Sequence, residues 1–209
     1  MPKHSASKLF GLAGLRSSCS RALFFSCVAM ISRPLVAAGA DTPLQQILSE
    51  FTKLKHGHVH FQEQIESPML KAPIVTSGEL FFDAPDRLEK RTLFPTPNDL
   101  ILEGNQVSIV HGTTSRSFRL SEYPQLRPLL DGIRATLAGD LPTLEKNFLI
   151  AVSLSSESWT LTLRPLPSEA TPAYESIVVR GNAGKIREVT LERRPGERSH
   201  MIMTEPAQS

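Results

Sequence analysis

The chain of 209 residues is poor in cysteine and contains only Cys19 and Cys27. Both lie within residues 1–40, so the rest of the chain has no cysteine at all. This absence excludes a disulfide framework, a thiolate nucleophile and a cysteine-ligated metal for residues 41–209. That stretch is long enough for one domain, which must therefore be held together by its hydrophobic core.

A strong excess of charge of one sign is also missing. The full sequence has a formal net charge of +2, but five of its 23 basic residues and none of its acidic residues lie in residues 1–40. Without those five, 18 basic residues remain against 21 acidic ones, which is a net charge of −3. Nucleic-acid binding depends on a basic surface that contacts phosphates, so we expect no nucleic-acid partner.

Hydrophobic runs are short near the N-terminus. The apolar run Ala22–Ile31 is too short to span a bilayer, which takes roughly 20 residues. Four basic residues precede it: Lys3, Lys8, Arg16 and Arg21. A small-residue stretch, Ala38–Ala40, follows and has the pattern of a cleavage site. We therefore predict that residues 1–40 are a cleaved signal peptide, that the exported periplasmic protein begins at Asp41, and that residues 41–209 form a single domain.

Residues Thr76–Val107 predict the middle of an antiparallel sheet. Bulky β-favouring residues form short runs there, each ending at Pro, Gly or Asn. The connections are too short for a crossover helix, so consecutive strands must pair antiparallel. The runs are Thr76–Asp83, Arg87–Phe94, Asp99–Leu102 and a fourth from Gln106. Further strands are predicted at His58–Glu66, Ser117–Leu120, Phe148–Leu154, Trp159–Arg164, Ser176–Gly181, Ile186–Glu192 and Met201–Met203.

Three helices are predicted from apolar periodicity and capping residues. Thr42 and Gln45 can form a capping box, and a stripe from Leu44 to Phe51 extends that helix to about Lys55. A second stripe ends at Gly139, and Asp140 can cap a short third helix. The second stripe consists of Leu126, Leu129, Leu130, Ile133 and Leu137. Pro128 must lie in the first turn of this helix, because deeper it would interrupt the hydrogen bonds.

Polar clusters give little support for catalysis or metal binding. His58 and His60 are two residues apart on a predicted strand and could face one metal, but no third ligand is near in sequence, so we interpret them as a solvated face. Two pairs of carboxylates are interpreted as solvated in the same way: Glu63 with Glu66, and Asp83 with Asp86. The chain has neither a G-x-S-x-G nor an H-E-x-x-H motif. We expect no cofactor, no metal site and no enzymatic activity.

Several short motifs occur in an order known from one family. They are Phe61–Gln64, Ser77–Leu80, Pro85–Leu88, Asp99–Gly104, Leu137–Asp140 and Trp159–Pro165. With them, nearly all of residues 41–209 resembles the LolA family of periplasmic outer-membrane lipoprotein carriers, in the divergent branch with a Leu-x-Gly-Asp turn followed by Trp-x-Leu-x-Leu-x-Pro. The resemblance implies a mainly β fold, an open antiparallel half-barrel with a helical lid over its concave face. In familiar members an Arg that helps to hold the lid closed stands where this chain has Ala84.

The resemblance implies a carrier that shelters acyl chains of lipoproteins or of another acylated lipid and ferries them toward the outer membrane. Its partners would be this cargo, an inner-membrane donor complex and an outer-membrane acceptor, and we expect a monomer. The residues expected to line the acyl-chain cavity are Leu48, Phe51, Phe61, Leu80, Phe82, Leu93, Leu129, Ile133 and Trp159. Each of them could equally be ordinary core.

Two other classes of function stay open. The same half-barrel could be a non-transporting sensor of lipid or lipoprotein, or a module that holds a partner protein. An exported hydrolase is the third hypothesis, and the missing motifs disfavour it.

Overall fold

The computed structural model describes residues 41–167, 171–193 and 196–206, all within one compact unit, Gly39–Ser209. The predicted signal peptide, residues 1–40, and its cleavage lie outside the described residues. None of the helices in the described ranges is long and apolar enough to cross a membrane.

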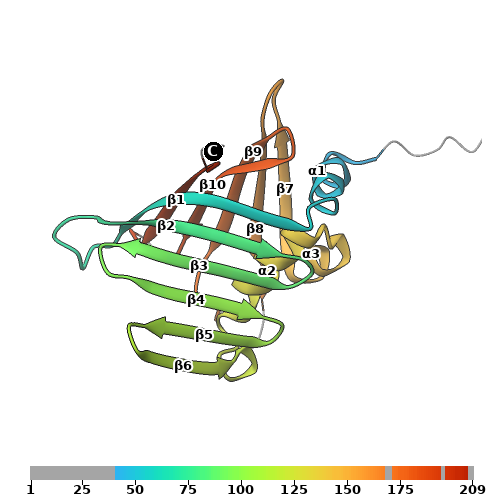
Figure 1. The fold of residues 1–209 in the computed structure, drawn as a ribbon. Coiled ribbons are helices and arrows are strands. Elements are labelled where there is room, and N and C mark those ends of the chain that lie inside the picture. The colour runs from blue at the N-terminus through green and yellow to red at the C-terminus, as the bar shows by residue number, and fades with distance from the viewer. Residues whose placement is uncertain (1–40, 168–170, 194–195, 207–209) are drawn as a thin grey trace, which may run out of the picture. The chain divides into compact units, whose positions relative to one another are not determined.

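Eleven antiparallel strands form one sheet, shown in Figure 1. Its order is β6-β5-β4-β3-β2-β1-β11-β10-β9-β8-β7. The first six strands are β1 (His56–Glu66), β2 (Ile74–Asp83), β3 (Arg87–Phe94), β4 (Asn98–Glu103), β5 (Gln106–His111) and β6 (Thr114–Arg119). The others are β7 (Phe148–Leu154), β8 (Trp159–Pro165), β9 (Ser176–Asn182), β10 (Lys185–Glu192) and β11 (Arg198–Thr204). β6 and β7 are the two edges of the described sheet, which is therefore open, and the predicted fold class is confirmed.

The strands follow the sequence signals closely. Arg87–Phe94 and Phe148–Leu154 have the predicted bounds, since each is bounded by turn residues or a helix end. β2 begins at Ile74, two residues before the predicted start at Thr76, because its pairing with β1 continues to Ile65 opposite Ile74. Ser67–Pro73 is therefore the connection of a long hairpin.

Of the three α-helices, α1 and α3 begin where the capping residues predict. α1 (Pro43–Phe51) starts with the Thr42–Gln45 capping box. It ends four residues before the predicted Lys55, because β1 begins at His56 and pairs with Asp83. A 3-10 turn, η1 (Leu120–Glu122), follows β6, and then α2 (Arg127–Ala138) has Pro128 in its first turn and Gly139 at its end with φ 68°. In α3 (Leu141–Asn147) the Asp140 side chain accepts a hydrogen bond from the Thr143 backbone N–H at 3.1 Å.

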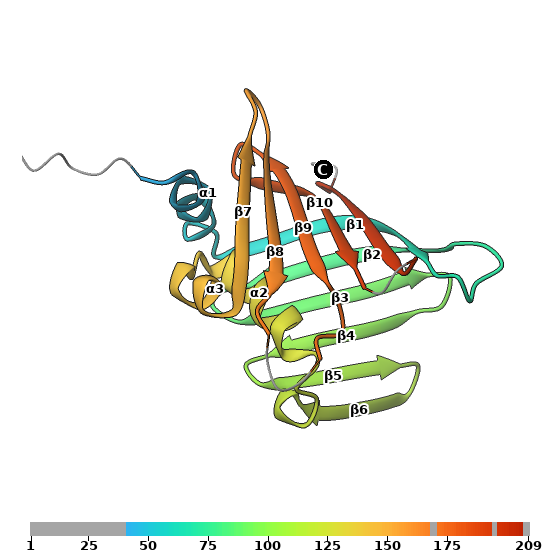
Figure 2. The same cartoon turned by 180° about the vertical axis from the view of Figure 1, so that it is seen from behind.

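The sheet curls around α2. The larger buried cluster joins all three helices to β7–β10, and Leu129 and Ala135 of α2 belong to it or pack against it. Leu130 of the same helix and Leu126, its N-cap residue, pack against a smaller cluster, made by Leu102 and neighbouring side chains of β3–β6 and η1. β5 and β8 are second and tenth in the sheet order, about 38 Å apart in a flat sheet at about 4.8 Å per strand. One helix can contact both ends only if the sheet bends, and Figures 1 and 2 both show the helices on one side of it.

Candidate functional site

The inner face of the sheet, which we define as the face that α2 covers, is mainly apolar. Val59 of β1 lies opposite Leu80 of β2, and Phe82 of β2 lies opposite Leu88 of β3. Leu88 in turn lies opposite the fully buried Leu102. Side chains of directly paired residues point to the same face, so these rows form a continuous apolar surface.

The outer face of the same strands is polar. The Phe81 ring stacks on His58 with ring centroids 4.5 Å apart, and the Arg91 guanidinium lies 4.9 Å from the Phe81 centroid. His58 Nε2 is 3.1 Å from a carboxylate oxygen of Glu79. This is the solvated polar face that the alternation of β1 predicts. Among the described residues, no group of three or more His, Asp or Glu side chains could hold a metal ion.

Three of the expected cavity residues are core residues. Leu48 and Phe51 of α1 and Trp159 of β8 are all buried in the larger cluster. The rings of Phe51 and Trp159 pack edge to face, with centroids 5.7 Å apart. These side chains attach α1 to the β7–β10 half of the sheet.

Five others lie on the inner face or on the helix above it. Phe61 and Phe82 are buried on the inner face, and Leu80 is half-buried there. On α2, Leu129 packs against the larger cluster, whereas Ile133 is half-buried and belongs to neither cluster. The structure therefore brings Phe61, Leu80 and Phe82 together along β1 and β2.

Leu93 lies apart from the other expected cavity residues. The pairing of β2 with β3 shifts between Gly78–Thr92 and Ser77–Phe94, so Leu93 occupies an irregularity of the ladder. The residue is 53% exposed. A run of alternating residues cannot reveal such a shift, because its position depends on the partner strand.

A charged pair in the middle of the inner face was missed by sequence reasoning. The Lys90 ammonium of β3 donates a hydrogen bond to Glu63 Oε2 of β1. Thr76 donates to the same oxygen at 3.2 Å, and Ser199 of β11 donates to Glu63 Oε1. Glu63 is only 6% exposed, so its interpretation as a solvated carboxylate is wrong. The signal was available in part, since Glu63 is two residues from Phe61 and shares its face.

The surroundings of Glu63 favour its ionised form. Burial by itself would raise the pKa of the carboxyl, but the nearby Lys90 charge and the hydrogen bonds from Lys90, Ser199 and Thr76 outweigh burial and hold the pKa below its usual range. Lys90 also lies over the Phe61 ring, 4.9 Å from its centroid. The inner face therefore combines a large apolar surface with one ion pair.

A second polar contact ties α2 to the sheet. Arg134 of α2 donates a hydrogen bond to the backbone carbonyl of Gly104, in the turn between β4 and β5, and another to Asp131 at 2.8 Å. On its opposite side, α2 approaches β7 and β9 so closely that a Cβ added at Gly132 would lie 2.7 Å from Phe148 Cζ. The helix is thus packed tightly on the β7–β9 side, and Leu126, Leu130 and the Arg134 hydrogen bond hold it on the β4–β5 side.

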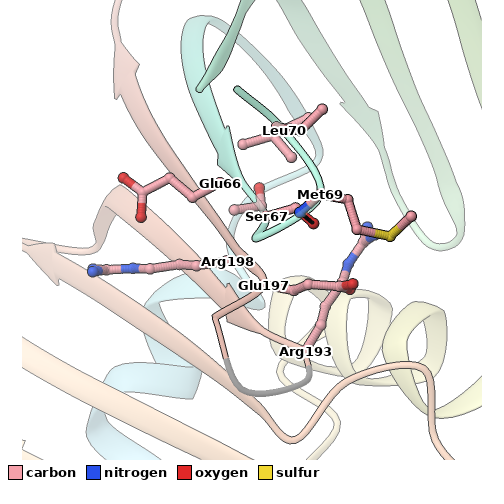
Figure 3. A pocket seen from close by; sticks show the side chains of 9 residues that line it. Glu66, Ser67, Met69, Leu70, Arg193, Glu197 and Arg198 are labelled. Carbon is pink, nitrogen blue, oxygen red and sulfur yellow. Dashed lines mark hydrogen bonds between the residues drawn. The ribbon is translucent and has the colours of Figure 1, made fainter. Parts of the chain in front are cut away.

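One cavity lies at the end of the sheet away from the helices. It has a volume of about 250 Å³ and lies between the Ser67–Pro73 connection and the ends of β10 and β11. Figure 3 shows Met69 and Leu70 on one side of it and Arg193 and Glu197 on the other. Ser199, which donates to Glu63, also lines the cavity, so the cavity adjoins the charged pair.

An open antiparallel sheet curled around a helix, with an apolar inner face, defines the class of half-barrel proteins. The family described as "Outer membrane lipoprotein carrier protein LolA-like" matches residues 36–208, and the chain belongs to this family. The resemblance found in the sequence motifs is thereby confirmed.

Comparison with curated proteins found no match. Among solved structures, a LolA superfamily protein from Nitrosomonas europaea is similar with a TM-score of 0.42 and 11% identity, covering 79% of this chain and 93% of that chain. The MucA/MucB complex of Pseudomonas aeruginosa is similar with a TM-score of 0.44 and 10% identity, covering 80% of this chain and 59% of that chain.

Proposed function

We propose that this protein binds the acyl chains of lipoproteins or of another acylated lipid on its inner face, and that it carries them through the periplasm toward the outer membrane. The observation that supports this most directly is the apolar surface of Val59, Leu80, Phe82 and Leu88 on the face that α2 covers. Family membership supports it as well. The protein acts by binding alone, without catalysis, and exchanges cargo with membrane partners on either side.

Reversible transport requires that binding is not too strong. Each buried methylene contributes about 0.8 kcal/mol, so a fully sheltered chain of about sixteen carbons would approach 12 kcal/mol. Leu126, Leu130 and Arg134 join α2 to the β4–β5 side of the sheet. Separating two half-buried leucines and a charge-assisted hydrogen bond costs about 3–5 kcal/mol. Displacement of these contacts by cargo would offset part of the binding free energy and permit release.

Two adjacent side chains of β2 provide a matched test. Leu80 and Phe81 are both half-buried, but Leu80 is on the inner face and Phe81 on the outer face. A fluorescent fatty-acid analogue should bind residues 41–209, and Leu80→Gln should weaken this binding about tenfold while Phe81→Gln leaves it unchanged. Equal effects of both variants would argue against the inner face as the binding surface.

Mass spectrometry of lipid extracted with the purified protein identifies the cargo. Acylated lipid or lipoprotein peptides are the expected result. A protein that co-purifies with a partner and no lipid would instead support the partner-binding alternative.

A further inference from the structure

The ion pair Lys90–Glu63 lies inside the proposed lipid-binding surface and has no role in holding apolar chains. Lys90 has Leu80 and Leu100 as its cross-strand neighbours on the inner face, and Glu63 has Thr76 and Met201. Burying a charged pair costs desolvation free energy that an apolar pair of similar size would avoid. Its position on this face therefore calls for a chemical explanation beyond stability.

The route of the Lys90 side chain is set by the strand between the two charges. Lys90 is opposite Leu80, whereas Glu63 is opposite Thr76, so the pair crosses β2 diagonally at Gly78. Gly78 has no side chain, and the backbones of β2 and β3 come close together there, since a Cβ at Gly78 would lie 2.0 Å from the Arg91 carbonyl oxygen. The Phe61 ring supports the ammonium along the way.

The two charges differ in what they can still bind. Glu63 accepts hydrogen bonds from Lys90, Thr76 and Ser199, and its side chain is only 8% exposed. The Lys90 side chain is 27% exposed, and within the described residues its ammonium has Glu63 as its one hydrogen-bond acceptor. An ammonium has three N–H donors. The positive partner is therefore the one with donors left for a ligand.

Along β1–β3 the inner face has a polar band next to Lys90, and Ile65 lies opposite Ile74 beyond this band. Thr76, Thr92 and Ser199 lie on the side of Lys90 toward the cavity shown in Figure 3. Phe82 and Leu88 lie on the other side of it, toward the helices. An amphiphile would bind with its headgroup near Lys90 and its chain toward α2.

We propose that Lys90 is a headgroup-binding residue, and that the inner face selects amphiphiles with an anionic oxygen group, a carboxylate or a phosphate, at one end of the acyl chain. This inference rests on the proposed function. Glu63 competes with the ligand for the ammonium, which keeps the binding of the anion reversible.

The test compares a fluorescent polyene fatty acid with its methyl ester, which has the same chain and no charge. Residues 41–209 should bind the acid about tenfold more tightly than the ester, because a charge-assisted hydrogen bond forms only with the acid. Lys90→Met should abolish this preference. Glu63→Gln should increase it several-fold, since the ammonium loses its competitor.

Lys90→Met and Glu63→Gln break the same ion pair but should change the preference for the acid in opposite directions. If the pair had only a structural role, both variants would change the preference in the same direction. If Lys90→Met does not fold, the double variant Glu63→Gln/Lys90→Met removes the buried charge and should bind acid and ester equally. Lys185→Met is the matched control, because Lys185 pairs with Glu205 at the β9–β10 turn and should leave the preference intact.

Each outcome has a separate meaning. Equal binding of acid and ester by the unaltered protein overturns the inference and leaves the proposed function standing, whereas failure to bind either ligand defeats the proposed function itself. Displacement by an alkyl phosphate or an alkyl carboxylate of equal chain length distinguishes the two sources of the anion. The one that displaces the probe at the lower concentration is the preferred headgroup.

Discussion

At the scale of single residues, Lys90 and Glu63 depend on each other. Removing one partner of a buried ion pair leaves an unpaired charge, which costs about 3–5 kcal/mol. Lys90→Met should therefore lower the free energy of unfolding by about 3 kcal/mol, and the double variant Glu63→Gln/Lys90→Met should recover most of that loss. Urea denaturation of the unaltered protein, the single variants Lys90→Met and Glu63→Gln and the double variant at neutral pH measures the coupling of the two side chains. Additive losses would mean that the two side chains act independently.

The same pair predicts how stability responds to acid. The pKa of Glu63 in the folded protein is below the ordinary value that the unfolded chain has. The ionised Glu63 therefore contributes fully to the free energy of unfolding at pH values above the ordinary carboxyl pKa. This contribution is lost as the pH falls through the pKa that Glu63 has in the folded protein. Between pH 7 and about pH 3, the unaltered protein should lose more stability than the double variant Glu63→Gln/Lys90→Met, which has no carboxyl there to protonate. An equal loss of stability in the two proteins would contradict the lowered pKa of Glu63.

Tyr174 presents the opposite case, a buried polar atom without a partner. Its hydroxyl has no hydrogen-bond partner among the described residues, and burial, with the nearby Asp131 charge, raises its pKa above the usual range. The phenol is therefore neutral and unsatisfied. Tyr174→Phe should leave the free energy of unfolding unchanged or raise it by up to about 1 kcal/mol. A loss above about 1 kcal/mol in urea denaturation would show that the hydroxyl is satisfied.

At the scale of elements, α2 is predicted to separate from β4–β5 when cargo binds. Arg134→Cys with Asn105→Cys places two thiols across this contact in a stretch, residues 41–209, that otherwise has no cysteine. Joining them with a short bifunctional maleimide should abolish binding of the fluorescent fatty acid. Joining Ser108→Cys to Ser117→Cys is the control, since these residues are paired across β5 and β6 on the outer face. Undiminished binding after the first cross-link would exclude this movement.

The sequence predicts elements well and their contacts poorly. Capping residues and alternation place α1, α3 and most strands, because these signals are local. The stripe on α2 indicates one apolar face, yet Leu129 and Leu130 contact different clusters, and Gly132, which is not part of the stripe, packs closely on Phe148. Which strands a helix covers depends on how far the sheet curls, and no single segment encodes that.

The candidate site shows the same limit. Alternation along β1 is enough to put Glu63 on the face of Phe61, and alternation along β3 puts Lys90 on the face of Leu88. Their contact also requires the register of β2, with Gly78 at the crossing point, and the return of β11 beside β1. The pairing of β11 with β1 joins residues more than a hundred positions apart, and so does the hydrogen bond from Ser199 to Glu63.

At the scale of the whole described unit, stability is predicted to be uneven. The larger cluster joins three helices to β7–β10, whereas Leu102, Val107 and Leu120 are the buried residues of the smaller one. Amide hydrogens of β8 and β9 should therefore exchange more slowly than those of β4 and β5, and a bound fatty acid should slow the second group most. Hydrogen-exchange mass spectrometry measures both. Uniform protection across the sheet would contradict a half-barrel that opens on one side.

An unclosed sheet also leaves two places where another copy of the chain could add a strand. β6 and β7 are the edges of the described sheet, and edge strands with free backbone groups are sites of aggregation. β7 exposes Leu149, which is 63% accessible, whereas β6 exposes Arg116 and Arg119. The charged side chains of β6 repel the β6 strand of a second copy of the chain. They also disfavour burial of β6 against an apolar edge strand such as β7. The open sheet thus carries, at the β6 edge, charged side chains that oppose its growth into a fibril.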